Sequence, residues 1–118
     1  MNVLLVAFLV LPLTQSTSAT RWRCTPKETQ ECSPVGCERQ KHTVWFLVDK
    51  DRRTYSRCNA AGCDTYGAEV STAGIFTTYE VRGRATFLRM AEASRHFIGA
   101  WTEGVNSIVN GGTCEPER

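Results

Sequence analysis

The sequence predicts an all-β fold, a small up-and-down meander or barrel of about eight short strands that is stabilised by disulfides. Two observations lead to this class. Segments rich in β-branched and aromatic residues recur about every ten residues, with turn residues between them. All six cysteines follow a hydrophobic leader, so we expect them to reach an oxidising compartment in which cysteines usually pair.

The chain begins with a segment typical of secretory signal peptides, residues 1–19. An apolar run from Val3 to Leu13 is followed by small residues that end at Ala19. The run is too short for a membrane span, and no second long apolar stretch follows it. Residues 20–118 are therefore predicted to be a single disulfide-stabilised β domain without a transmembrane span, located in the periplasm or secreted.

In the first half of this domain the sequence predicts strands at 21–24, 43–48, 53–58 and 63–66. The polar stretch 25–43 is interpreted as a loop because prolines and a glycine interrupt it. The last two strands are short and flank residues 59–62, which predicts a β-hairpin. Gly62 is expected to take a positive φ before the return strand.

In the second half, residues 74–81 and 107–114 are predicted strands. The segment 84–101 allows two interpretations, since its apolar residues have helical spacing but also fit two strands, 85–90 and 96–101. The surrounding meander favours the strands. Closure of such a meander would pair the last strand with the first and bring the terminal cysteines together.

Six cysteines allow fifteen pairings, and the sequence alone does not choose among them. Geometry favours Cys58–Cys63 and Cys32–Cys37, because each pair flanks a short turn, and it leaves Cys24–Cys114. The two Cys-x4-Cys pairs also suggest a structural zinc site, but the leader argues for disulfides. No redox Cys-x-x-Cys motif is present either. We therefore predict structural disulfides, with no metal site and no cofactor.

The charge balance argues against a nucleic-acid-binding protein. A formal net charge of +2 is too small to indicate a nucleic-acid partner, which would need a dense basic stripe. Eleven arginines accompany only three lysines, and arginine suits bidentate binding of carboxylates and phosphates. Solvated arginines on strand faces are nevertheless the simpler interpretation of this bias.

The sequence contains no recognisable catalytic pattern, and no catalytic residue is predicted. His42 and His96, the two histidines, lie in no metal-binding or triad motif. The better functional candidates are Tyr55, Arg57, Asp64 and Tyr66, which bracket the Cys58–Cys63 loop and combine residue types common in interface hot spots. Two structural roles compete with binding. The two tyrosines could fill one face of the barrel as cross-strand partners, and Asp64 could pair with Arg57 across the hairpin.

These observations predict a non-catalytic binding module that acts on another protein, such as an inhibitor or a host- or stress-interaction factor. The alternative is a carrier of a small apolar, lipid-like ligand, since a barrel can enclose one apolar cavity. That cavity would be lined or filled by six aromatic residues, Trp22, Trp45, Phe46, Phe76, Phe87 and Trp101. An enzyme of unknown type is a third interpretation.

Several motifs together resemble a group of small exported alphaproteobacterial proteins. They are Tyr55-Ser56-Arg57-Cys58, Gly62-Cys63-Asp64, a Ser-x-x-Gly-x-Phe strand at 71–76 and the terminal Gly112-x-Cys114. The resemblance implies a periplasmic or secreted location in the bacterial envelope and no particular activity. Ser71-Thr72-Ala73-Gly74 and the later tryptophan strand at 97–101 are more loosely similar to the pattern of periplasmic inhibitors of C-type lysozyme, which implies the architecture of a disulfide-linked β-barrel.

Overall fold

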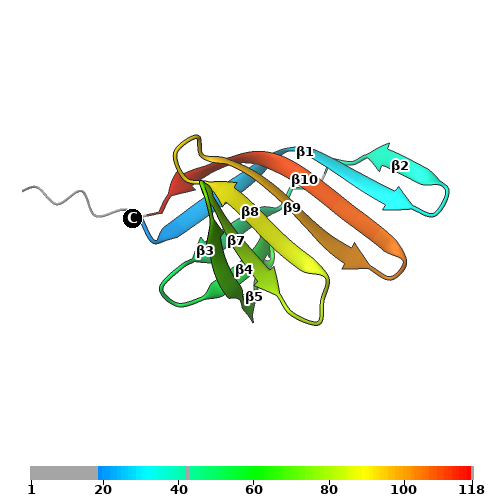
Figure 1. Cartoon of the computed structure of the whole chain (residues 1–118). Coiled ribbons are helices and arrows are strands. Elements are labelled where there is room, and N and C mark those ends of the chain that lie inside the picture. Colours follow the sequence, from blue (N-terminus) through cyan, green and yellow to red (C-terminus); the bar gives the residue numbers. More distant parts are fainter. Residues whose placement is uncertain (1–18, 42, 118) are drawn as a thin grey trace, which may run out of the picture.

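The computed structural model describes residues 19–41 and 43–117, and these residues form an all-β domain without a helix (Figure 1). The predicted signal peptide therefore lies outside the described residues, except for Ala19. The ten strands are β1 (Arg21–Ser33), β2 (Gly36–Arg39), β3 (Trp45–Asp49), β4 (Thr54–Asn59), β5 (Gly62–Gly67), β6 (Glu69–Ala73), β7 (Phe76–Val81), β8 (Thr86–Ala91), β9 (His96–Glu103) and β10 (Asn106–Pro116).

The strands form one antiparallel sheet in the order β5-β4-β3-β1-β10-β9-β8-β7-β6, and β2 pairs with β1 beside this path. The first and last strands pair along most of their length, from Trp22↔Pro116 to Cys32↔Ser107. This confirms the predicted all-β meander with its terminal strands together. The strands of 84–101 are also confirmed, as β8 and β9.

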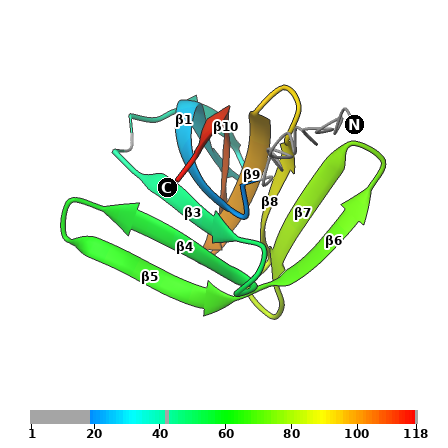
Figure 2. The ribbon, with the colours of Figure 1, turned by 90° about the vertical axis from the view of Figure 1, so that its left-hand side faces the viewer.

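The sheet curls into a nearly closed barrel, and its two edge strands, β5 and β6, follow each other in the chain at a bend. Residues 62–67 pair with β4 and residues 69–73 pair with β7, and only Ala68 separates the two pairings. The N–H of Ala68 donates to the Arg53 carbonyl at 2.8 Å, so the chain leaves β4 just after this point. Figure 2 shows β5 and β6 meeting at this bend and diverging from it on either side of the barrel. We call the gap between β5 and the β7–β9 region the seam.

Strand alternation places one apolar face inside the barrel. Phe46 lies at the centre of the interior, with its ring centroid 5.8 Å from that of Tyr55, 6.0 Å from Phe97 and 5.7 Å from Trp101. The largest fully buried side chains are Tyr55, Tyr79, Phe46, Leu88, Met90, Ile108 and Val48. The interior near the seam is therefore a packed aromatic core.

The predicted loop at 25–43 is wrong for most of its length, because β1 runs on to Ser33 and returns as β2. A register shift between Pro26 and Glu28 lets the strand continue past a residue that has no N–H to donate. Beyond the shift, β1 and β10 extend from the barrel together with β2 and the end of β9 (Figure 1). Strand β6 was expected only in part, since the Ser-x-x-Gly-x-Phe strand at 71–76 overlaps its end, but residues 74 and 75 form the turn to β7.

Three disulfides have the expected pairing, Cys24–Cys114, Cys32–Cys37 and Cys58–Cys63, with Cα atoms 3.9, 4.0 and 4.0 Å apart. The first joins β1 to β10 inside the core, where Cys24 is 0% and Cys114 1% exposed. The other two join the strands of the β1–β2 and β4–β5 hairpins. Three disulfides in a small β domain are consistent with a location outside the cytoplasm.

The close approach of β1 and β10 at the bulge depends on Gly112. A Cβ at this position would overlap the Thr25 carbonyl and lie 2.9 Å from the Lys27 nitrogen, both of which are backbone atoms. We expect Gly112→Ala to lower the free energy of unfolding by about 2 kcal/mol or more, in the range of overpacked cores. Gly67→Ala is the matched control, since its Cβ would have no atom within 4 Å, and it should change stability by less than about 0.5 kcal/mol. Urea unfolding measures both, and equal effects would contradict the argument.

Tyr79 gives the fold a sensitivity to alkaline pH. Its hydroxyl is buried without a hydrogen-bond partner among the described residues. Burial, followed by the nearby Glu92 and Asp49 carboxylates, raises the pKa of Tyr79 well above the ordinary value of 10.0. The unfolded chain therefore loses this proton first, and stability should fall as pH rises above about 10.

We expect Tyr79→Phe to leave stability at pH 7 unchanged or higher, because it removes an unpaired buried hydroxyl. It should also make the loss of stability above pH 10 shallower, as followed by urea unfolding across the pH range. Tyr66→Phe, at a half-buried position, controls for the removal of a tyrosine. A loss of stability equally steep in wild type and Tyr79→Phe would contradict the assignment.

The disulfides should differ in their contribution to stability according to the loops that they close. Removal of Cys58–Cys63, five residues apart, by two alanine substitutions should cost about 2 kcal/mol and preserve the fold. Removal of Cys24–Cys114, ninety residues apart, should cost about 4–5 kcal/mol by the same chain-entropy relation, besides any loss of core packing. Denaturant unfolding of the two double variants tests this order, and a reversed order would refute it.

Candidate functional site

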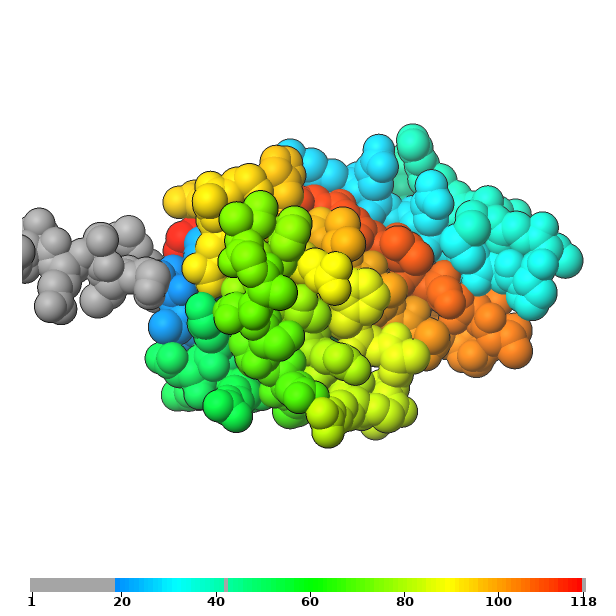
Figure 3. All heavy atoms as spheres, viewed as in Figure 1, coloured from blue at the N-terminus to red at the C-terminus, as the bar shows by residue number. Residues whose placement is uncertain are grey.

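A pocket of about 170 Å³ lies at the seam. Its lining consists of Tyr55 and Arg57 from β4, Tyr66 from β5, Arg84 from the β7–β8 turn, Thr86 from β8 and Thr102 from β9. In the space-filling view the green band formed by β5 and β6 lies at the surface, with the yellow-green β7–β8 turn beside its lower end (Figure 3). The pocket is thus lined by residues from β4 and β5 on one side of the seam and from the β7–β9 region on the other.

The β4–β5 hairpin supplies one wall of the pocket. Tyr55 is paired with Tyr66 and Arg57 with Asp64, so strand alternation turns all four side chains to the inner face. The Arg57 guanidinium carbon lies 4.9 Å from the centroid of the Trp101 ring, which is 3% exposed. The Trp101 Nε1–H donates to Glu103 at 3.2 Å, which orients the indole. Arg57 is therefore held by a cation–π contact with a fixed aromatic face.

The β7–β8 turn supplies the opposite wall and a second arginine. Two threonine hydroxyls donate to the Arg84 carbonyl, Thr86 Oγ1 at 3.0 Å and Thr102 Oγ1 at 3.2 Å. Ala85 completes the turn with a φ of 47°. The Arg84 guanidinium carbon lies 4.6 Å from the centroid of the Tyr66 ring, across the seam from its own strand. Two stacked arginines consequently face one pocket.

Neither arginine has an acidic partner among the described residues, since the ion pairs within 4.0 Å involve other cations, namely Arg21, Arg39, Lys50 and Arg82. The predicted cross-strand pair of Arg57 and Asp64 has the expected register but does not form an ion pair within that distance. Arg57 stacks on Trp101 instead. The pocket therefore presents two planar groups whose N–H donors suit a carboxylate or phosphate.

Tyr55 closes the inner end of the pocket and is only 2% exposed. Burial raises the pKa of its phenol, and Tyr66 raises it further, although the neighbouring Arg57 guanidinium lowers it. Tyr55 therefore remains a neutral hydroxyl at physiological pH. This hydroxyl can donate to an anion without adding a competing negative charge.

The structure brings three of the four predicted binding residues together. Tyr55, Arg57 and Tyr66 line the pocket, whereas Asp64 is exposed on β5 and does not. The sequence analysis missed Arg84, Thr86 and Thr102, which come from distant parts of the chain. No local pattern marks them, and only the pairing order of the strands places them beside the hairpin.

The interior aromatic set predicted for a ligand carrier is only partly correct. Trp22, Phe46 and Trp101 are buried in the core. Trp45, Phe76 and Phe87 alternate with inward residues on β3, β7 and β8, so they lie on the outer face. Trp45 there stacks against Arg23 at 4.8 Å.

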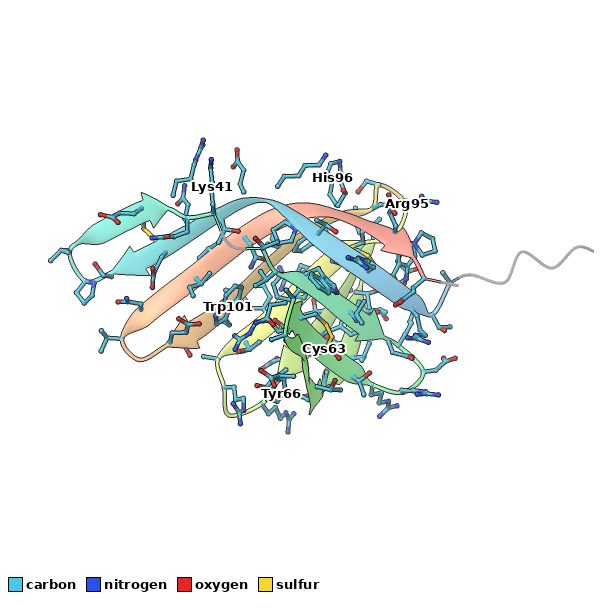
Figure 4. All side chains as sticks on the ribbon, turned by 180° about the vertical axis from the view of Figure 1, so that it is seen from behind. Lys41, Cys63, Tyr66, Arg95, His96 and Trp101 are labelled. Atoms are coloured by element: carbon cyan, nitrogen blue, oxygen red, sulfur yellow. A yellow bond between two sulfur atoms is a disulfide. The ribbon has the colours of Figure 1, made fainter. Side chains whose placement is uncertain are left out.

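The other side of the molecule carries different chemistry. Figure 4 shows Lys41, Arg95 and His96 on the side opposite Cys63 and Tyr66. A shallow hollow of about 540 Å³ lies beside His96, next to the half-exposed Ile98 and Val109. His42 lies outside the described residues. Within 19–41 and 43–117, no group of three or more His, Cys, Asp or Glu residues could hold a metal ion.

The described part of the chain contains no helix that is long and apolar enough to cross a membrane. Comparison with known proteins is also negative, since no family model, curated protein or solved structure matches this chain. The resemblance to small exported alphaproteobacterial proteins therefore stays a prediction.

Proposed function

We propose that this protein is a non-catalytic, exported binding module of the bacterial envelope, periplasmic or secreted, which recognises an acidic group on another protein through the seam pocket. The proposal is carried by one observation. Arg57 and Arg84 are each stacked on an aromatic ring, line the same pocket and have no carboxylate within 4.0 Å among the described residues.

Electrostatics supports an anionic ligand. Two guanidinium groups that line one small pocket repel each other, and the repulsion is relieved when an anion binds between them. Their stacking on Trp101 and Tyr66 orders both side chains before binding, which lowers the entropic cost of forming bidentate hydrogen bonds. The Tyr55 hydroxyl adds a neutral polar group to the same pocket, whereas the Thr86 and Thr102 hydroxyls donate to the Arg84 carbonyl and hold the turn that carries Arg84.

The size of the pocket favours a side chain of a macromolecule over a free small molecule. At about 170 Å³ it is smaller than the roughly 300–1,000 Å³ of typical small-molecule sites. Aromatic residues and arginine are also the types that dominate hot spots between proteins. The packed barrel interior, with Phe46, Tyr55, Leu88 and Met90 fully buried, gives the alternative of a lipid-like carrier less support.

The proposal predicts that the partner is lost when the two charges are removed. Immobilised wild-type protein should retain a specific protein from envelope extracts or host secretions. The double variant Arg57→Gln, Arg84→Gln should bind it at least about tenfold more weakly, because each charged hydrogen bond contributes about 1.5–3 kcal/mol. Arg89→Gln is the matched control, since Arg89 is an exposed arginine on the outer face of β8.

Purified C-type lysozyme serves as a defined probe in the same experiment, read out by direct binding and by inhibition of cell-wall lysis. Lysozyme bound by wild type and Arg89→Gln, but not by the double variant, would identify the module as an inhibitor. Retention of no protein from any of these sources, or equal retention by the double variant, would overturn the proposed function.

A further inference from the structure

Strand β5 has an open edge at the seam. It is the first strand in the sheet order and pairs with β4 alone among residues 19–41 and 43–117, so its other edge has no described strand beside it. All of its residues are exposed except Tyr66, which is half-buried. An open edge of this kind is a template for a further strand.

The hairpin geometry identifies which backbone groups face the open edge. Hydrogen-bonded and non-hydrogen-bonded pairs alternate along an antiparallel ladder. The N–H of Ala68 donates to Arg53 on the β4 side, so Tyr66, Asp64 and Gly62 also direct their backbone groups toward β4. Cys63 and Thr65 therefore direct their N–H and C=O groups outward. The 4.0 Å separation of the Cys58 and Cys63 Cα atoms agrees, because non-hydrogen-bonded pairs are the closer ones.

This edge has little of the protection that exposed edges usually carry. Strand β5 has the sequence Gly-Cys-Asp-Thr-Tyr-Gly, without proline, lysine or arginine. By contrast, the other edge strand, β6, carries a charged pair at its start, between Glu69 and Arg82. Cys58–Cys63 and the hydroxyl contact between Ser56 and Thr65 at 2.8 Å also hold β5 firmly against β4. The edge is thus rigid and open.

The arginine pocket borders this same edge. Tyr66 of β5 forms one wall, and Arg84 reaches over its ring from the other side. In a strand added to β5, inward side chains would stand beside Gly62, Asp64 and Tyr66. An acidic side chain is repelled beside Asp64, whereas beside Tyr66 it meets Arg84, whose guanidinium lies over the Tyr66 ring, and enters the pocket that Arg57 also lines. These charges favour an acidic side chain of the added strand beside Tyr66 and disfavour a second acidic side chain beside Asp64.

We propose that the partner contributes an extended segment that adds as a strand to the open edge of β5. An Asp or Glu side chain of this segment enters the pocket beside Tyr66, and a neutral or basic residue two positions away faces Asp64. This inference rests on the proposed function and names the chemistry of its partner. Backbone hydrogen bonds to Cys63 and Thr65 supply affinity, and the two arginines supply selectivity.

A phage-displayed library of random peptides of about ten residues tests the motif, since this length covers one strand. Selection on the folded protein should enrich peptides with one acidic residue and a neutral or basic residue two positions from it. A synthetic peptide of the enriched sequence should slow amide hydrogen exchange at Cys63 and Thr65, measured by NMR. Enrichment without an acidic residue, no enrichment, or protection confined to other strands would overturn the inference.

Two substitutions at one position separate edge pairing from other effects. Thr65→Pro removes an N–H that faces the open edge while leaving the ladder to β4 intact. Thr65→Val removes the hydroxyl contact with Ser56 but keeps the N–H. We expect Thr65→Pro to weaken peptide binding at least about tenfold and Thr65→Val to change it little. Equal affinity of the two variants would contradict strand addition, and the exchange measurement on wild type decides the matter if Thr65→Pro does not fold.

The outcomes also separate this inference from the proposed function. If a partner is captured through Arg57 and Arg84 but leaves the exchange of the Thr65 amide unchanged, strand addition is wrong and the binding module stands. If peptides protect the Thr65 amide but no natural partner is captured, β5 accepts an added strand and the proposed function is wrong. Protection of Thr65 that grows with protein concentration in the absence of peptide would show that a second copy of the chain occupies the edge, which would also overturn the inference.

Discussion

The pairing of β1 with β10 joins two halves of one sheet, whose other ends meet at the bend around Ala68 between β5 and β6. Strands β3 to β5 extend from one side of this pair and strands β9 to β6 from the other. The buried disulfide Cys24–Cys114 fixes the pair from inside the core, and the bulge with Gly112 lets the two long strands stay close past Pro26. Because the terminal strands are fixed together, incomplete closure of the barrel is confined to the opposite side, at Ala68. The location of the seam is thus a consequence of where the chain ends meet.

The seam is also where charged groups are tolerated at the margin of an aromatic core. Other inward positions hold apolar side chains such as Phe46 and Leu88 or buried polar ones such as Thr77, whereas Arg57 lines the seam pocket and is only half-buried. Burying a guanidinium fully would be costly without a partner, but here its charged head reaches water while its plane packs on Trp101. Arg84 does the same from the opposite side against Tyr66. The two contacts link the halves of the barrel across the gap without neutralising either charge.

The sequence predicted those features that depend on local spacing. Cysteines five residues apart indicated the disulfides Cys32–Cys37 and Cys58–Cys63, and the strands around the second pair indicated its hairpin. Turn residues gave the strand rhythm, whereas the hairpin around Cys32–Cys37 was expected to be a loop. The segment 84–101 was ambiguous by periodicity, and only the surrounding meander favoured two strands. Three features depended on information outside each segment. A bulge that rescues β1 at Pro26 requires its partner Gly112, the inward or outward face of Trp45 and Phe87 depends on a one-residue choice of register, and Arg84 reaches the pocket only through the order of the strands.

An open strand edge exposes a protein to association with the wrong partners, so its presence here needs a physical reason. Complete closure would place β5 against β7 and β8 and fill the space between Tyr66 and Thr102, leaving no access to Arg57. The bend at Ala68 keeps that access while the disulfide Cys58–Cys63, on the outer face of the same hairpin, prevents the edge from fraying. A rigid edge loses little conformational entropy when another strand binds, and this is the condition under which a short segment can bind tightly. The same cross-link that stabilises the hairpin therefore keeps its open edge in the extended conformation that the proposed strand addition requires.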